Sequence, residues 1–186
     1  MTEPVTTYRF TVEQYRQMGL SGVLREGDRV ELIEGEIVTM SPIGSRHAAC
    51  VKRSNQVFGN RLGSRVLIGV QDPLELNEHS EPEPDLCLLV PRPDFYASGH
   101  PRPKDILLAI EVADSSLDYD RDVKIPLYAR AGIREAWLVD LLARRIEVYR
   151  LPSPTGYESV EIVAETGTIA PEAFPDVRIG VSEILP

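Results

Sequence analysis

Two acidic residues stand at the ends of apolar, strand-like segments. Glu111 lies inside Ile106–Ala113 (ILLAIEVA), and Asp85 opens Asp85–Val90 (DLCLLV) directly after Pro84. Burying an unpaired carboxylate costs several kcal/mol or shifts its pKa, so each acid needs a compensating group. If the two strands pair in antiparallel fashion, the start of one lies beside the end of the other. The two carboxylates would then meet at one edge of the sheet.

Neighbouring carboxylates repel each other unless they share a proton or bind a cation, and such oxygen ligands favour Mg²⁺, Mn²⁺ or Ca²⁺ over zinc. Each acid also has an ordinary explanation. Glu111 could pair with an arginine or end its strand in solvent, and Asp85 could be a turn residue after a proline. Taken together, and with the lysine described next, the pattern favours a metal site.

Lys124 is the third candidate group, one of only three lysines in a chain with 17 arginines. It falls in a predicted helix, Asp120–Ala131. A helix packed on the sheet just after Glu111 can direct its first turn at that strand end. There, the ammonium would hold a hydroxide or a phosphate oxygen. The alternative is an exposed ion pair with Asp120, four residues earlier. Tyr128, one turn further on, is expected to be a core aromatic residue.

The elements that must position these groups follow from periodicity and turn residues. A capped helix starts after Thr11, and Glu34-Gly35 indicates a hairpin. A long helix is expected over Arg46–Leu62, and Pro91–Asp105 is expected to be an irregular loop. Strands are expected at Arg29–Ile33, Glu36–Met40, Val66–Val70, Leu74–Leu76, Asp85–Val90, Ile106–Ala113, Glu135–Asp140, Arg145–Arg150, Tyr157–Val163 and Val177–Ile179. This order predicts an α/β fold with a mixed central sheet, helices on both sides and a β-rich C-terminal tail.

Length and composition fit one domain, because 186 residues of which 42% are hydrophobic can bury a core without disulfides. We expect a helix and hairpin over 1–40, a core over 46–140 and the tail over 141–186. No apolar run is long enough for a membrane span, and the N-terminus does not resemble a secretory signal. Cys50 and Cys87 are expected to be buried free thiols, which predicts a cytoplasmic location. The net charge of −9 argues against binding DNA by charge attraction alone.

Several ordered motifs resemble one known family. They are Glu83-Pro84-Asp85, Glu111-Val112-Ala113-Asp114-Ser115-Ser116, Asp120-Arg121 with Lys124 and Tyr128, Ala131–Asp140 (AGIREAWLVD), and, in the N-terminal part, Val30–Val38 and His47. This combination resembles the Uma-two family of restriction endonucleases, within the PD-(D/E)XK nuclease superfamily. The resemblance implies a restriction-endonuclease-like core and metal-dependent hydrolysis of DNA phosphodiester bonds with Mg²⁺ or Mn²⁺. It further implies that Asp85 and Glu111 are metal ligands, with the Val112 carbonyl as a third contact.

The chain departs from the superfamily at Ala113, where the motif lysine usually stands. The resemblance implies that Lys124 supplies that charge from the following helix. Two further residues are possible members of the site. His47, near the start of the long helix, is either a neutral ligand or base, or a core histidine. Glu31 either reaches the cleft, as an additional acid does in related nucleases, or faces solvent; the acidic stretch from Glu75 to Glu83 is expected to be largely solvated.

Two other functions remain open. A nuclease fold can serve as a binding protein without activity, which Ala113 and the negative charge favour, and the same site could hydrolyse a different phosphoester. We also predict a homodimer, because the strand Arg145–Arg150 and the tail could leave a sheet edge that needs covering.

Overall fold

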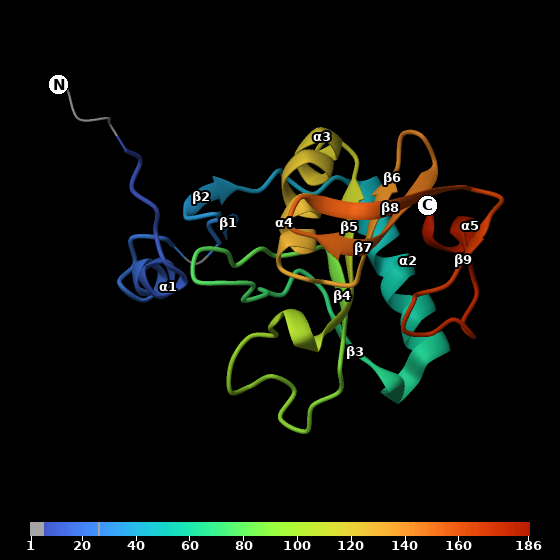
Figure 1. Cartoon of the computed structure of the whole chain (residues 1–186), viewed down its shortest axis with the longest axis horizontal. Helices are drawn as coiled ribbons and strands as arrows, with labels where there is room; N and C mark the ends of the chain where they lie inside the picture. Colours follow the sequence, from blue (N-terminus) through green and yellow to red (C-terminus); the bar gives the residue numbers. More distant parts are fainter. Residues whose placement is uncertain (1–5, 26) are drawn as a thin grey trace.

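A six-stranded mixed sheet forms the centre of the computed structural model, which describes residues 6–25 and 27–186 (Figure 1). Its spatial order is β3-β4-β5-β6-β7-β8, and only β5 and β6 run parallel to each other. The strands are β3 (Leu67–Gly69), β4 (Leu86–Leu89), β5 (Ile106–Ala113), β6 (Glu135–Asp140), β7 (Arg145–Ser153) and β8 (Gly156–Ala164). None of the helices within those residues has the length and apolar character needed to cross a membrane.

Helices cover both faces of this sheet, as the alternation of its side chains requires. Ile110 on β5 packs in one core with Phe58 of α2 (Ser45–Leu62) and with Trp137. The opposite face of β5 carries Ala109 and Ala113, which pack toward α4 (Ile125–Arg130). Glu111 shares this second face, since it lies two residues from each alanine. The expected arrangement of one helix on each side of a mixed sheet is confirmed.

The N-terminal part is a helix followed by a hairpin. Thr11 accepts a hydrogen bond from the Gln14 amide and caps α1 (Val12–Leu20), while the Gln14 side chain completes the capping box. Strands β1 (Val30–Ile33) and β2 (Glu36–Thr39) pair in antiparallel fashion. At the turn between them, Glu34 and Gly35 have φ angles of +49° and +80°. Two successive left-handed residues are what a two-residue hairpin turn needs, so the predicted turn is confirmed.

The segment after β5 is more irregular than the single helix predicted over Asp120–Ala131. It begins with α3 (Leu117–Tyr119), continues as a π-helical turn over Asp120–Lys124, and becomes α4 at Ile125. Within the π turn, the Ile125 N–H donates to the carbonyl of Asp120. The next residue, Pro126, has no N–H to donate, so the regular α-helical ladder is interrupted at this point.

The predicted strand Leu74–Leu76 is wrong. The segment 74–82 turns back on itself. The Leu74 N–H donates to the Pro82 carbonyl at 2.9 Å, and the Leu76 N–H donates to the Ser80 carbonyl at 3.0 Å. Because these partners are local, the segment lies outside the main sheet. The remaining elements are short: η1 (Gly63–Arg65), η2 (Pro103–Asp105), β9 (Thr168–Ile169), β10 (Ile179–Gly180) and α5 (Val181–Ile184).

The C-terminal tail after β6 follows the prediction with one difference. The tail is β-rich, but β7 and β8 extend the main sheet, while β9 and β10 pair separately.

Cys50 and Cys87 are free and fully buried, as expected. Burial raises the pKa of both thiols to about 12, which keeps them protonated and unreactive.

Candidate active site

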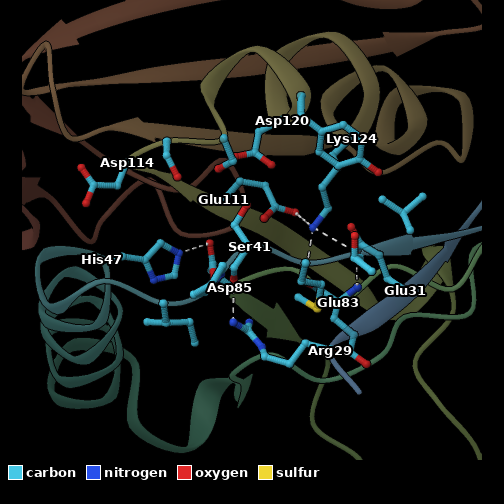
Figure 2. Close-up of a pocket in the computed structure, with 18 of the residues that line it drawn as sticks. Arg29, Glu31, Ser41, His47, Glu83, Asp85, Glu111, Asp114, Asp120 and Lys124 are labelled. Carbon is cyan, nitrogen blue, oxygen red and sulfur yellow. Dashed lines mark hydrogen bonds and ion pairs between the residues drawn. The ribbon is translucent and has the colours of Figure 1, made fainter. Parts of the chain in front are cut away.

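A cavity of about 360 Å³ opens where β4 begins and β5 ends. Its walls come from the N-terminal hairpin, the loop before α2, the first turn of α2 and the segment that carries the π turn. Figure 2 shows that the side chains of Glu31, His47, Asp85, Glu111 and Lys124 converge on this space. All five candidate side chains from the sequence therefore line one cavity.

Asp85 lies immediately before β4, beside the end of β5. Leu86 pairs with Ile110 in antiparallel register, so the predicted strand pairing is confirmed. Asp85 Oδ2 accepts hydrogen bonds from the Val112 N–H and from His47 Nε2, both at 2.9 Å. Gln71 Nε2 donates to the other oxygen at 3.2 Å. Burial alone would raise the pKa of Asp85, but the contact with His47 and the charge of Lys124 lower it, so the carboxylate stays ionised.

His47 sits in the first turn of α2 and is half-buried. Its hydrogen bond to Asp85 raises the pKa of the imidazole above its usual value, against the opposing effect of burial. The positive end of the helix dipole disfavours a charged imidazole at this position, but the nearby Asp85 carboxylate outweighs that effect. The second ring nitrogen, Nδ1, is buried without a hydrogen-bond partner among the described residues.

Glu111 is 2% exposed and has two partners. Tyr128 donates its hydroxyl to Oε1, and Lys124 Nζ lies 2.8 Å from the same oxygen. Neither ordinary explanation of Glu111 holds, because its charged partner is a lysine and the strand end is not in solvent. Burial raises the pKa of Glu111 well above its usual value, although Lys124 opposes that shift. Tyr128 is buried as expected, and it also orients this carboxylate.

Lys124 lies at the end of the π turn, 4% exposed, and points into the cavity (Figure 2). Besides Glu111, its ammonium contacts Glu31 Oε2 at 3.2 Å and donates to the Glu83 carbonyl at 3.3 Å. The alternative of an exposed ion pair along the helix surface is wrong. Burial alone would lower the pKa of Lys124, but the surrounding carboxylates raise it, so the side chain stays charged.

Glu31 reaches the cavity because the hairpin docks on the segment before β4. Leu32 forms an isolated β-bridge with Glu81, and the Glu83 N–H donates to Glu31 Oε2 at 3.1 Å. The side chain is 3% exposed, so the solvent-facing alternative for Glu31 is wrong. The neighbouring acidic stretch is also less solvated than expected, since Glu81 is 4% exposed and forms an ion pair with Arg16.

Asp120 also lines the cavity, whereas the sequence presented it as a motif residue and as a surface partner of Lys124 but not as a site residue. It is 5% exposed, and the Ser116 hydroxyl donates to its Oδ2 at 2.5 Å. Burial raises the pKa of Asp120 to about 6, with opposition from Lys124. The four-residue spacing between Asp120 and Lys124 indicates that the two side chains are neighbours on a helix, but it does not say whether that face of the helix lies in solvent or in a cleft. For Gln71, nothing in the sequence pattern pointed to the site.

The donors in this cavity fit a hard divalent cation. The carboxyl groups of Asp85, Glu111, Asp120 and Glu31 line the cavity together with a single lysine, and oxygen is the ligand that Mg²⁺ and Mn²⁺ prefer. Across residues 6–25 and 27–186, no three His, Cys, Asp or Glu side chains are already arranged to hold a metal ion. An ion at Asp85 and Glu111 would therefore need further oxygens, such as the Val112 carbonyl or water.

Two comparisons with known proteins agree with the fold. The crystal structure of a putative nuclease belonging to DUF820 from Anabaena variabilis superposes with a TM-score of 0.71 and 15% sequence identity, covering 94% of this chain and 97% of that one. That similarity shows a shared fold and confirms the predicted architecture. A search of the curated proteins finds no match. Residues 12–182 match Uma2, the family described as putative restriction endonuclease. The chain therefore belongs to the Uma2 family.

Proposed function

We propose that this protein is a metal-dependent endonuclease that hydrolyses phosphodiester bonds in DNA. The observation that carries the proposal is the position of Lys124, which meets Glu111 beside Asp85 although it comes from a helical turn. Two strand-end carboxylates and one charged amine are the groups that phosphodiester hydrolysis needs at such a site. Membership of a restriction endonuclease family supports the same substrate class.

Each residue has a distinct part in the proposed mechanism. Asp85, Glu111 and the Val112 carbonyl would hold Mg²⁺ or Mn²⁺. When bound, the ion supplies a water of lowered pKa and offsets charge that grows on the phosphate. Lys124 orients the attacking hydroxide or a phosphate oxygen as a point charge. Cleavage would release a 3′-hydroxyl and leave a 5′-phosphate.

The supporting residues keep the two acids in position. The imidazole of His47 and the amide of Gln71 each donate to Asp85, so that carboxylate is fixed at both oxygens. Tyr128 does the same for Glu111. Glu31 balances the charge of Lys124 from the hairpin side, which stabilises the ammonium while the site is free of substrate.

Phosphate contacts would come from Arg29 in the cavity wall and from Arg46, which pairs with the cavity residue Asp114. Arg29 lines the cavity and donates to the Ser41 carbonyl at 2.7 Å, and half-exposed Arg46 stands at the start of α2. These local cations reduce the weight of the overall charge of −9 as an objection. Action as a homodimer and a cytoplasmic location are parts of the same proposal.

A plasmid nicking assay with Mg²⁺, Mn²⁺ or a chelator tests the proposal. We expect wild-type protein to convert supercoiled DNA only when metal is present, and Glu111→Gln to abolish the conversion. Glu36→Gln is the matched control, because Glu36 is an exposed hairpin acid outside the cavity. Nicking that survives Glu111→Gln would overturn the assignment. If DNA remains intact but a small phosphodiester is hydrolysed, the assignment of DNA as the substrate is wrong, while the assignment of metal-dependent phosphodiester hydrolysis holds.

A further inference from the structure

Strand β8 is the outer edge of the central sheet. It follows β7 in the strand order, and within the part of the chain that the structure describes no further strand pairs with it. The sequence predicted an edge from the strand Arg145–Arg150 and the tail, and in the structure the edge is the tail strand β8, which pairs with β7. An unpaired edge presents a row of free N–H and C=O groups that another strand can bind.

β8 lacks several of the features that usually protect such an edge, and its only charged side chains are Glu158 and Glu161. Its sequence, GYESVEIVA, contains no lysine and no proline over nine residues. Val160 is 51% exposed and Ile162 is 59% exposed. They stand opposite Tyr149 and Glu147 on β7, so both lie on the same face of the sheet. The edge therefore combines free backbone groups with an apolar strip.

We propose that β8 pairs with β8 of a second copy of this chain, in antiparallel fashion, and joins the two sheets into one. A two-fold axis perpendicular to the sheet leaves each side chain on its own face and places each strand against an identical one. Overlap of all nine residues of Gly156–Ala164 then centres the axis on Val160. The occupant is a second copy because the strand is complementary to itself in this register.

The charges on β8 support that register. Centring on Val160 places Glu158 opposite Ile162 of the second copy and Glu161 opposite Ser159 of the second copy, so no two acids face each other. Centring one residue later would place Glu161 opposite its own copy, which like-charge repulsion disfavours. Glu161 is also paired within its own chain, at 3.6 Å from Arg150.

The same register covers the exposed apolar side chains. Val160 faces its own copy across the axis, and Ile162 flanks this pair on each side. The four side chains form one strip, and the pairing removes their exposed surface from water. Backbone hydrogen bonds would provide affinity, while the strip and the charges fix the register.

Light scattering and a cysteine cross-link test the pairing without requiring any catalytic activity. We expect the wild-type chain to have the mass of a dimer at micromolar concentration. Val160→Lys should halve that mass, because it places two ammonium groups opposite each other. The exposed position of Val160 means that this variant should fold, and an unchanged circular dichroism spectrum checks that point.

Val160→Cys gives a test of register, since the two new thiols would face each other at the axis. We expect mild oxidation to produce a disulfide-linked dimer in that variant. Leu142→Cys is the matched control, because Leu142 is 67% exposed on the turn between β6 and β7, and it should remain uncrosslinked. Native Cys50 and Cys87 are buried and do not interfere. A monomeric wild type, a dimer unaffected by Val160→Lys, or equal cross-linking of both cysteine variants would overturn the proposal.

Discussion

The ammonium of Lys124 and the carboxylate of Glu111 lie 2.8 Å apart, although one belongs to a π-helical turn and the other to a central strand. Ala113, where the related motif carries its lysine, cannot make this contact. Lys124 brings a positive charge to Glu111 from the helical turn that follows β5, and not from β5 itself. The first prediction follows from that replacement.

Lys124→Ala should lower metal-dependent DNA cleavage by about 10²-fold or more, the usual scale for loss of one positioned electrostatic group. Lys124→Arg should not restore the rate, because a planar guanidinium is too bulky for the enclosed space around Lys124, whose side chain is 4% exposed. Initial nicking rates measured for both variants under identical metal concentration check this. Full activity in Lys124→Arg would show that any positive charge suffices.

On a helix surface, Lys124→Ala would change stability by less than about 1 kcal/mol, because an exposed helix ion pair contributes only tenths of a kcal/mol. Lys124 is instead buried between Glu111 and Glu31. Removing one member of a buried ion pair costs about 3–5 kcal/mol. Urea unfolding should therefore detect a clear loss, and the activity of this variant has to be measured under conditions where it remains folded.

Mg²⁺ or Mn²⁺ titrated into the wild-type protein should bind, and Glu111→Gln should bind much more weakly. The reason is that the substitution removes a charged oxygen ligand but keeps the shape of the side chain. Isothermal titration calorimetry measures the difference, with exposed Glu36→Gln as the control that should bind as the wild type does. Equal affinity in all three proteins would place the ion elsewhere.

Tyr128→Phe should destabilise the protein by about 1–3 kcal/mol, the usual cost of removing a hydrogen-bond partner from a buried polar group. The hydroxyl donates to Glu111, which is fully enclosed, so water cannot replace it. Tyr157→Phe is a matched control, because Tyr157 donates to the neutral Ile133 carbonyl at 2.7 Å. Chemical denaturation of both variants provides the comparison, and an equal or larger loss in Tyr157→Phe would contradict the assigned role of Glu111.

Glu147 predicts a pH dependence of folding stability. Burial alone would raise the pKa of this β7 carboxylate, but Arg121, Tyr149 and Arg145 bind it and lower the pKa below the usual value. A carboxylate with a lowered pKa stabilises the folded state above its unfolded pKa, and that stability is lost as pH falls through its folded pKa.

Glu147→Gln should accordingly be less stable than wild type at pH 7, and the difference should shrink as the solution is acidified below about pH 4.5, near the unfolded pKa of glutamate. Denaturant unfolding between pH 7 and pH 3.5 measures the gap. Arg121 belongs to the same turn as Lys124, so the variant also tests how firmly that turn is attached to β7. A gap that stays constant across this range would refute the linkage.

Local patterns were sufficient for the elements that hold Asp85 and Glu111. Apolar runs define β4 and β5, and the antiparallel pairing follows once the two acids are required to meet. Glu31 and Glu81 could not be placed in this way. Their burial depends on the docking of the hairpin and of α1, with Arg16 bonded to both Glu75 and Glu81. Contacts between segments so distant in sequence leave no local periodicity.

The roles of Tyr128 and Gln71 were missed for a different reason. A tyrosine on an apolar helix face is normally core, and nothing in the sequence says which acid its hydroxyl meets. Gln71 adopts a left-handed φ of +55°, which turns its side chain toward Asp85. Such a backbone conformation in a residue other than glycine depends on the surrounding structure and not on residue type.

The π turn over Asp120–Lys124 also sets the orientation of the helix that follows it. A π turn contains one residue more than the α-helical turn it replaces, so the later side chains are rotated by about 100° around the helix axis relative to an uninterrupted α-helix. Lys124 ends this turn and contacts Glu111, while α4 begins at Ile125 and packs its apolar side chains on the sheet. One extra residue therefore lets a single continuous segment place a charge in the cavity and an apolar face on the core.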